Sequence, residues 1–404
     1  MQKGGIFKLM ICILTESELA RSHGTGAQIL QMFQGAQFHH FYWKIGHGQR
    51  SEVPQSTLLA DWIPNVPKIG GVVRRLRRLS GMTWWHGNQI NAPWLRHLLR
   101  SQGLTFDVVY VVIARESDAQ RALSIVRQIG APYVLHMMDI LETDGLKPER
   151  MPAIGELLKG ASQLISLLPS ITREMRQFVR TPVREISIGQ KITAWTAREF
   201  EDDRAVRLVM VGRPYRGGCE LLANAWEAAK LSERKMELVY YGTQYNDIPA
   251  KLRNICRDGG YISNGEAYRK ILAEAHLAFL SGPNANDMHG KWSFPSRTVD
   301  YLMAGLPVLA CVSAGSATED VLKPISPQAV AFTRSESDII EAINRFTANQ
   351  AAWGSASRAA RSFAEKTMSL EVVRERVLAA LETAKVKGDE PLKSRRNADA
   401  SVAV

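Results

Sequence analysis

Residues 291–310 read KWSFPSRTVDYLMAGLPVLA, and this stretch decides the fold. Its first part, residues 291–297, is polar and contains Pro295, which is typical of a turn. From Thr298 onward the apolar residues recur with the spacing of an amphipathic helix. Gly305 is a residue type that ends helices, and residues 308–312 are then predicted to form a short buried strand. The stretch therefore predicts an α/β unit.

Polar side chains gather at the amino end of this predicted helix. Ser293, Ser296 and Arg297 come just before it, and Asp300 lies about one turn inside it. In parallel α/β sheets, ligands bind at the carboxyl ends of strands and at the amino ends of helices. We therefore expect these residues to bind a ligand, and an ordinary αβ unit with a serine cap is the alternative.

The composition is that of a soluble globular protein with room for two hydrophobic cores. The chain has 404 residues, of which 45% are hydrophobic and 23% are charged. Its four cysteines lack metal-ligand spacing, so we expect core thiols in a reducing cytosol and no metal site. No secretory signal or membrane span is predicted. The formal net charge of +11 indicates an anionic partner.

Strands and helices alternate in the first half of the chain, which predicts one doubly wound parallel sheet. A strand at residues 7–14 leads to a loop ending in Gly24, Thr25 and Gly26, and a helix follows from residue 27. Such a loop can hold a phosphate group, although a plain tight turn fits equally well. A later strand, residues 132–136, carries His136 to its carboxyl end, with Asp139 just beyond. A ligand-facing role and a buried structural histidine are both open for His136.

A second α/β pattern starts at residue 206, after a polar stretch at residues 193–204 that predicts a linker. A strand at residues 206–211 leads to a loop that contains Gly212, Arg213 and Arg216, and a helix follows. Backbone N–H groups and guanidinium forks in such a loop suit phosphate oxygens. Two solvated arginines on a turn are the alternative.

Residues 56–103 combine clustered arginines with tryptophans. The cluster suits an anionic membrane surface, and a helix packed on the sheet with solvated arginines fits equally well. Residues 385–404 have no apolar periodicity and are predicted to be a disordered tail. The residues of the basic and aromatic cluster are Arg74, Arg75, Arg77, Arg78, Trp84 and Trp85.

Two stretches resemble motifs of the retaining GT-B glycosyltransferases of family 4, the glycosyl transferases group 1 type. That family has the pattern E-x7-E followed by A-x-x-x-G-x-P-V. Asp300 stands at its second acid, residues 305–308 match its end, and Trp292 stands where the first acid would be. The family's V-G-R…K-G loop is matched by Arg213, and Arg216 takes the place of its lysine.

The resemblance implies an α/β, GT-B fold with two Rossmann-like doubly wound parallel-sheet domains facing across a cleft. We expect an acceptor-side domain at residues 1–192 and a nucleotide-sugar-binding domain at residues 205–365. A C-terminal helix at residues 366–384 is expected to cross back to the first domain. The resemblance further implies sugar transfer from a nucleotide sugar to an acceptor hydroxyl, retaining and without a metal or a cofactor other than this co-substrate.

The resemblance also assigns the site. The expected catalytic residues are His136, Asp139, Arg213 and Arg216. The expected donor-binding residues are Gly24, Thr25, Gly26, Gly212, Arg213, Arg216, Ser293, Ser296, Arg297 and Asp300, with Asp300 on the nucleotide ribose.

The expected acceptor is a glycan or a lipid-linked glycan, as in polysaccharide or glycolipid biosynthesis. We expect a cytoplasmic protein that can lie on the inner face of the cytoplasmic membrane, and no nucleic-acid partner. Because Trp292 replaces an acid, one alternative stays open. It is a catalytically degenerate GT-B protein that binds nucleotide or glycan as the partner of an active transferase.

Overall fold

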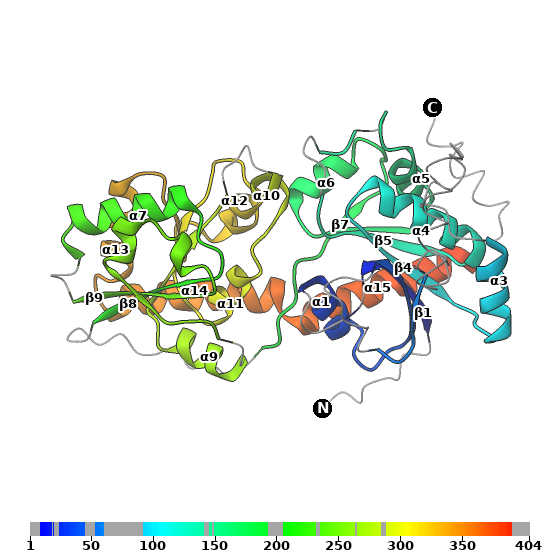
Figure 1. The fold of residues 1–404 in the computed structure, drawn as a ribbon, viewed down its shortest axis with the longest axis horizontal. Coiled ribbons are helices and arrows are strands. Elements are labelled where there is room, and N and C mark those ends of the chain that lie inside the picture. The colour runs from blue at the N-terminus through cyan, green and yellow to red at the C-terminus, as the bar shows by residue number, and fades with distance from the viewer. Residues whose placement is uncertain are drawn as a thin grey trace, which may run out of the picture. The chain divides into compact units, whose positions relative to one another are not determined.

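The computed structural model describes residues 9–17, 19, 24–44, 53–59, 92–140, 145–147, 149–192, 205–231, 235–262, 265–283 and 288–389. They form two compact units, each built on one parallel sheet with helices around it (Figure 1). The first unit comprises Met1–Leu167, Ile171–Ile186 and Arg374–Val404, and the second comprises Leu168–Ser170 and Ser187–Val373.

The first unit has a seven-stranded parallel sheet in the order β3-β2-β1-β4-β5-β6-β7. The chain runs outward from β1 to β3 and then returns to place β4 beside β1, as in a doubly wound fold. β4 reads VVYVVI and buries every side chain, as expected for a central strand covered on both faces. The strands are β1 Met10–Ser17, β2 Gln37–Lys44, β3 Ser56–Leu58, β4 Val108–Ile113, β5 Tyr133–Met137, β6 Gln163–Ser166 and β7 Val183–Glu185.

Helices connect these strands. They are α1 Gly24–Met32, α3 Ala92–Ser101, α4 Glu116–Ile129, α5 Pro152–Gly160 and α6 Pro169–Met175. β1 begins at Met10 and continues to Ser17, three residues beyond the predicted end of the first strand.

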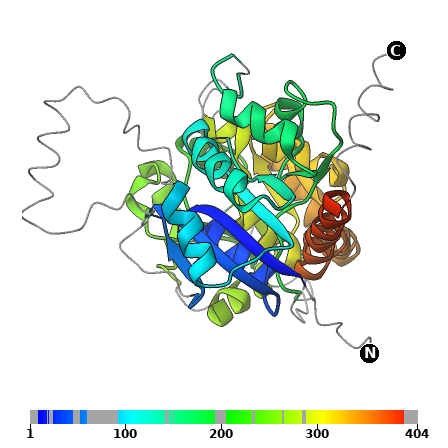
Figure 2. The same cartoon turned by 90° about the vertical axis from the view of Figure 1, so that its right-hand side faces the viewer.

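The C-terminal helical region differs from the prediction. Two helices are present, α14 Gln350–Met368 and α15 Leu370–Asp389, because Ser369 has an extended backbone and its hydroxyl caps the Val372 N–H at 3.2 Å. Residues 385–389 are helical, so the prediction of a disordered tail from residue 385 was wrong for them. Lys385 donates to the Asp107 carboxylate at 2.7 Å, which holds this end of α15 beside the start of β4 (Figure 2).

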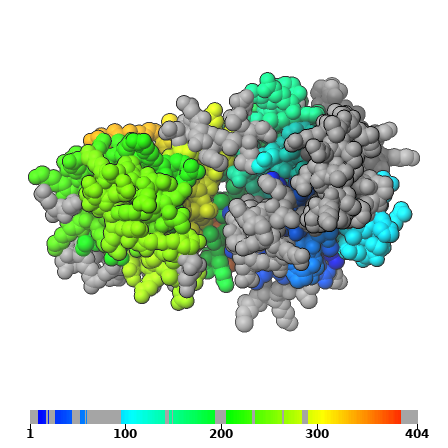
Figure 3. Space-filling model, viewed as in Figure 1, coloured from blue at the N-terminus to red at the C-terminus, as the bar shows by residue number. Residues whose placement is uncertain are grey.

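The second unit has a six-stranded parallel sheet in the order β10-β9-β8-β11-β12-β13. The order again reverses beside its first strand, β8, whose neighbours are β9 and β11. The strands are β8 Val206–Val211, β9 Met236–Tyr241, β10 Cys256–Asp258, β11 Leu277–Ser281, β12 Val308–Cys311 and β13 Val330–Phe332. On the face shown in Figure 3, most of this unit's visible surface comes from its green segments, which include α7 and β9.

Helices α7 and α13 pack together against this sheet and bury a continuous apolar core. The indole of Trp353 lies in that core and donates to the His276 carbonyl at 2.8 Å. The helices are α7 Arg216–Ala228, α8 Ala250–Arg253, α9 Gly265–Ala273, α10 Met288–Trp292, α11 Arg297–Met303, α12 Ala317–Leu322 and α13 Glu336–Phe346, with the 3₁₀ helices η2 Tyr245–Asp247 and η3 Lys323–Ile325.

Candidate functional site

The carboxyl edge of the second sheet is shaped by the loop that follows β8. Gly212 has φ +76°, a left-handed conformation that favours glycine. Its N–H donates to the Tyr241 carbonyl at 2.8 Å, and the Gly242 N–H donates to the Gly260 carbonyl at 3.0 Å. These bonds join the ends of β8, β9 and β10, so the loop has a fixed backbone path.

The amino end of α7 packs closely on the neighbouring strands. A Cβ atom built on Gly218 would lie 3.1 Å from Ser281 Cβ and 3.2 Å from Cys311 Sγ. The Tyr215 N–H donates to the Ser281 hydroxyl at 3.1 Å. The first N–H groups of an α-helix have no partner within the helix, so this end of α7 offers donors to an anion.

The two arginines predicted from the loop motif have different surroundings. The Arg213 side chain is exposed, and its guanidinium lies 5.5 Å from the centre of the Tyr215 ring. Arg216 begins α7, and its Nε lies 2.7 Å from Glu220 Oε1, one helical turn away. The Arg216 side chain is 84% exposed. Arg216 is therefore engaged by an acid on the surface of its own helix.

Arg297 begins α11, and its side chain lies at the same sheet edge. Its Nη2 donates to the carbonyl of Ser281 at 2.9 Å, and its Nη1 would lie 3.0 Å from a Cβ atom built on Gly212. Its Nε is buried, and no described residue accepts a hydrogen bond from it. The predicted donor-binding residues Gly212 and Arg297 are thus in direct contact.

Asp300 lies one turn into α11, as predicted, and is largely buried. Burial raises the pKa of its carboxyl group to about 7, although a hydrogen bond from the Tyr268 hydroxyl lowers it. The Tyr268 oxygen lies 3.3 Å from Asp300 Oδ2. The next residue, Tyr301, is fully buried and accepts the Val211 N–H at 2.8 Å, which ties α11 to the end of β8.

The remaining predicted residues of this stretch are less engaged. Ser296 is exposed, and its side chain does not cap α11, so the serine cap of the alternative interpretation is not formed by Ser296. Ser293 is partly buried. Trp292 ends α10, and its indole Nε1 is buried without a described partner. Where the resembled motif has an acid, this chain therefore has a hydrogen-bond donor.

His136 and Asp139 belong to the first unit. His136, near the end of β5, is buried, and its Nδ1 is hydrogen-bonded to the hydroxyl of the equally buried Tyr110. Burial lowers the pKa of His136 to about 3, so the imidazole is neutral. No described residue partners its Nε2. Burial also raises the pKa of Asp139 to about 7.

The direction of the Tyr110–His136 hydrogen bond follows from which of the two atoms is the better acceptor. Both residues are buried, and no further partner of the Tyr110 hydroxyl is found among the described residues. Either direction leaves one donor and one acceptor of the pair without a described partner. An imidazole nitrogen is a better acceptor than a phenol oxygen, so Tyr110 is assigned as the donor and Nδ1 as the acceptor, which places the imidazole proton on Nε2.

The first loop differs from its prediction. Gly24, Thr25 and Gly26 form the first turn of α1 instead of a loop before it. The basic and aromatic cluster of residues 74–85 and the linker at residues 193–204 lie outside the described residues.

Sequence reasoning did not identify Tyr110, Tyr268, Ser281 and Tyr301 as parts of the candidate sites. Each contacts a predicted site residue or loop, but its partner lies on another element. No short-range pattern in the sequence could have found these contacts.

Two findings concern absences within the described part of the chain. No group of three or more His, Cys, Asp or Glu side chains there could hold a metal ion. None of the helices described is both long and apolar enough to cross a membrane.

Comparison with known proteins gives structural matches but no sequence family. No protein-family model matches the sequence, and no curated protein sequence is significantly similar to it. A glycosyltransferase from Rickettsia africae ESF-5 has a TM-score of 0.66 at 10% identity, over 94% of this chain and 99% of that chain. HepE of Anabaena, solved in complex with UDP-glucose, has a TM-score of 0.61 at 11% identity, over 93% and 100% of the two chains.

The lipopolysaccharide outer core galactosyltransferase WaaB, in its apo form, is also similar. It has a TM-score of 0.61 at 11% identity, over 93% of this chain and 99% of that chain. These structures match nearly the full length of the chain, and both of its units have the expected parallel sheet. The chain therefore has the two-domain, Rossmann-like GT-B fold of these glycosyltransferases.

Proposed function

We propose that this chain is a glycosyltransferase that moves a sugar from a nucleotide-sugar donor to an acceptor hydroxyl. One observation carries the proposal: the Gly212 loop, the amino end of α7 and the arginines Arg213 and Arg297 meet at the carboxyl edge of the second sheet. Backbone N–H groups and guanidinium groups together suit the oxygens of a diphosphate. The fold supports the proposal, because HepE was solved with UDP-glucose and WaaB is a galactosyltransferase.

The proposed reaction breaks the bond between the anomeric carbon of the sugar and a phosphate oxygen of the nucleotide. The bonding electron pair stays on that oxygen, where the loop amides and the guanidinium of Arg213 stabilise the negative charge. The acceptor hydroxyl attacks from the side on which the phosphate leaves, and the leaving phosphate takes its proton. The configuration of the sugar is then retained, and the proposal requires no metal ion.

The remaining site residues have proposed roles that follow the resemblance. Asp300 would accept hydrogen bonds from the ribose, and its pKa of about 7 allows it to ionise near neutral pH. His136 would donate its Nε2–H to the sugar, because its Nδ1 already accepts from Tyr110. Asp139 is proposed as a further catalytic residue on the resemblance alone.

We further propose a glycan or lipid-linked glycan acceptor, in polysaccharide or glycolipid biosynthesis at the cytoplasmic face of a membrane. The support is the net charge of +11 and the arginine- and tryptophan-containing stretch at residues 74–85.

The first test is calorimetric titration of UDP, GDP and ADP into the protein, with and without EDTA, for the wild type and Arg213→Ala. The proposal expects one nucleotide to bind independently of EDTA, and more weakly to the variant. Failure of all three nucleotides to bind would contradict it. The sugars carried by the preferred nucleotide are then supplied with candidate glycan acceptors, and release of the nucleoside diphosphate is followed.

A catalytically degenerate GT-B protein is the second candidate. The observation that favours it is Trp292, whose indole N–H occupies the place of the resembled motif's first acid. This candidate expects the nucleotide to bind, but no donor and acceptor pair to release it.

A further inference from the structure

The side chain of Arg297 lies at the middle of the carboxyl edge of the second unit's sheet. β8 and β11 are neighbouring central strands, and Gly212 and Ser281 lie at their carboxyl ends. Arg297 reaches both ends: Nη2 donates to the Ser281 carbonyl at 2.9 Å, and Nη1 lies against Gly212. The guanidinium therefore lies directly beside the loop that is proposed to bind the diphosphate.

Among the residues that the structure describes, this guanidinium has no acidic partner. With described residues it makes one hydrogen bond, although a guanidinium carries five N–H donors, and no described residue accepts from its buried Nε. Asp300, in the same helix, accepts instead from the hydroxyl of Tyr268. A partly buried cation without a counter-charge is unfavourable in the free protein, so its surroundings suit an anionic ligand.

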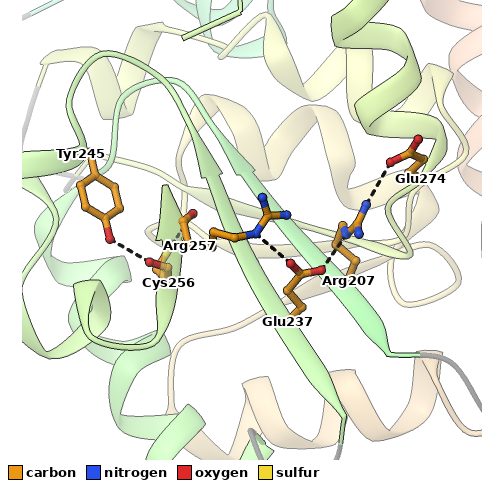
Figure 4. Close-up of polar contacts among 6 residues, drawn as sticks. All are labelled: Arg207, Glu237, Tyr245, Cys256, Arg257 and Glu274. Carbon is orange, nitrogen blue, oxygen red and sulfur yellow. Dashed lines mark hydrogen bonds and ion pairs between the residues drawn. The ribbon is translucent and has the colours of Figure 1, made fainter. Parts of the chain in front are cut away.

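Other arginines of the same unit show the opposite arrangement. At the amino edge of the sheet, Arg207 lies 2.9 Å from Glu237 and 3.1 Å from Glu274, and Arg257 lies 2.9 Å from Glu237 (Figure 4). Both cations there are paired with carboxylates. The lack of a described acidic partner at Arg297 is therefore not a general property of arginines in this unit.

The loop motif assigns the second phosphate-binding cation to Arg216, but Arg216 is paired with Glu220 at 2.7 Å on the exposed surface of α7. Arg213 directly follows Gly212 and forms no ion pair with a described residue. Arg213 and Arg297 are thus the two cations next to Gly212 that lack a described acidic partner.

We propose that Arg297 holds the diphosphate of the donor together with Arg213, in the position that the motif gives to Arg216. This inference rests on the proposed function. The planar guanidinium of Arg297 donates to the phosphate oxygens while Nη2 remains bonded to the Ser281 carbonyl, which fixes its orientation. The charge that develops on the leaving phosphate then faces a cation supplied by α11.

Calorimetry with the preferred nucleoside diphosphate and with its parent nucleoside tests the proposal on Arg297→Gln, Arg297→Lys and Arg216→Gln. Arg257→Gln is the matched control, because it removes an arginine that is paired at the opposite edge of the same sheet. We expect Arg297→Gln to weaken diphosphate binding by about tenfold to a hundredfold, the range for a charge-assisted hydrogen bond. Arg297→Lys should lose less, and Arg216→Gln and Arg257→Gln should change binding by less than about threefold.

Nucleoside affinity separates a direct phosphate contact from a structural effect. Under the proposal, Arg297→Gln binds the nucleoside as the wild type does, because only the phosphate contact is lost. Equal weakening of nucleoside and diphosphate binding, or a larger loss in Arg216→Gln than in Arg297→Gln, would overturn the proposal. If Arg297→Gln does not fold, the comparison of Arg297→Lys with Arg216→Gln decides. If the wild type binds no nucleotide, the proposed function itself fails, which is a distinct result.

Discussion

Replacing Asp300 with asparagine should stabilise the second unit, and the gain should be larger at pH 8 than at pH 5. The pKa of this carboxyl is 3.8 without the fold and is raised to about 7 by burial. Between these values the folded chain holds a proton that the unfolded chain has lost. The free energy of unfolding therefore falls as the pH rises from about 4 to about 7.

The expected change in the free energy of unfolding depends on how much of the interval between the two pKa values lies between pH 5 and pH 8. From pH 5 to about 7, at about 1.4 kcal/mol per pH unit, the wild type loses up to roughly 3 kcal/mol that Asp300→Asn retains. The side chain keeps some exposure to solvent, so we expect about 2 kcal/mol after screening. Asparagine can still accept from the Tyr268 hydroxyl, so the hydrogen bond itself is preserved.

The protein is unfolded with urea at pH 5 and at pH 8, and hydrogen exchange of peptides from β11 and β12 is the readout. This readout reports the free energy of unfolding of the second unit alone. Asp338→Asn is the matched control. The pKa of Asp338 is lowered by hydrogen bonds from the Arg334 and Ser335 backbone. Its carboxylate is therefore ionised at both pH values and stabilises the folded chain equally at each. This control should destabilise the unit equally at pH 5 and pH 8. An equal effect of Asp300→Asn at both pH values, or a loss of stability at pH 8, would refute the reasoning.

Three further predictions concern the two units. Gly212→Ala should lower the free energy of unfolding by about 1–2 kcal/mol, because φ is +76° there, whereas Gly217→Ala, with open space around its Cβ, should not destabilise in the same urea titration. Tyr110→Phe should cost about 1–3 kcal/mol in thermal unfolding, since it leaves the buried His136 Nδ1 without its partner, and a neutral result would contradict the assigned hydrogen bond. Glu237→Gln should cost about 1 kcal/mol or less at pH 7 and nothing near pH 2, because its two arginine partners lower the pKa of this carboxyl more than burial raises it.

Most of the fold could be predicted from the sequence because its strands are continuous apolar runs. Residues 206–211 were predicted as a strand and form β8, and the predicted strand at residues 308–312 contains the whole of β12 and ends one residue later. The break at Ser369 was not predicted, since both flanking segments favour helix and only the hydroxyl cap on Val372 distinguishes the position. The helical state of residues 385–389 was also missed, and its contact between Lys385 and Asp107 joins residues that lie far apart in the sequence.

Only those site residues could be predicted that belong to short motifs with a fixed spacing in the sequence. Gly212, Arg213, Arg297 and Asp300 could be chosen as candidates from short patterns in the sequence. Their surroundings could not be predicted, because the Tyr268 hydroxyl on Asp300 and the Ser281 carbonyl on Arg297 come from other elements. The sequence alone also could not show whether Arg216 would face a ligand or pair with an acid.

Most of α15, the last described helix of the chain, belongs to the first unit, and this has a consequence during synthesis of the protein. The first unit is made mainly of residues up to Ile186 and of residues from Arg374 onward, and all of the second unit except Leu168–Ser170 lies between them. Val377, Leu381 and Ala384 of this last segment are buried. A ribosome therefore releases the first sheet long before the helix that completes its unit. During that interval, the apolar surface of the first unit that these side chains cover in the folded protein is exposed to solvent. We therefore expect chaperones to bind the nascent first unit.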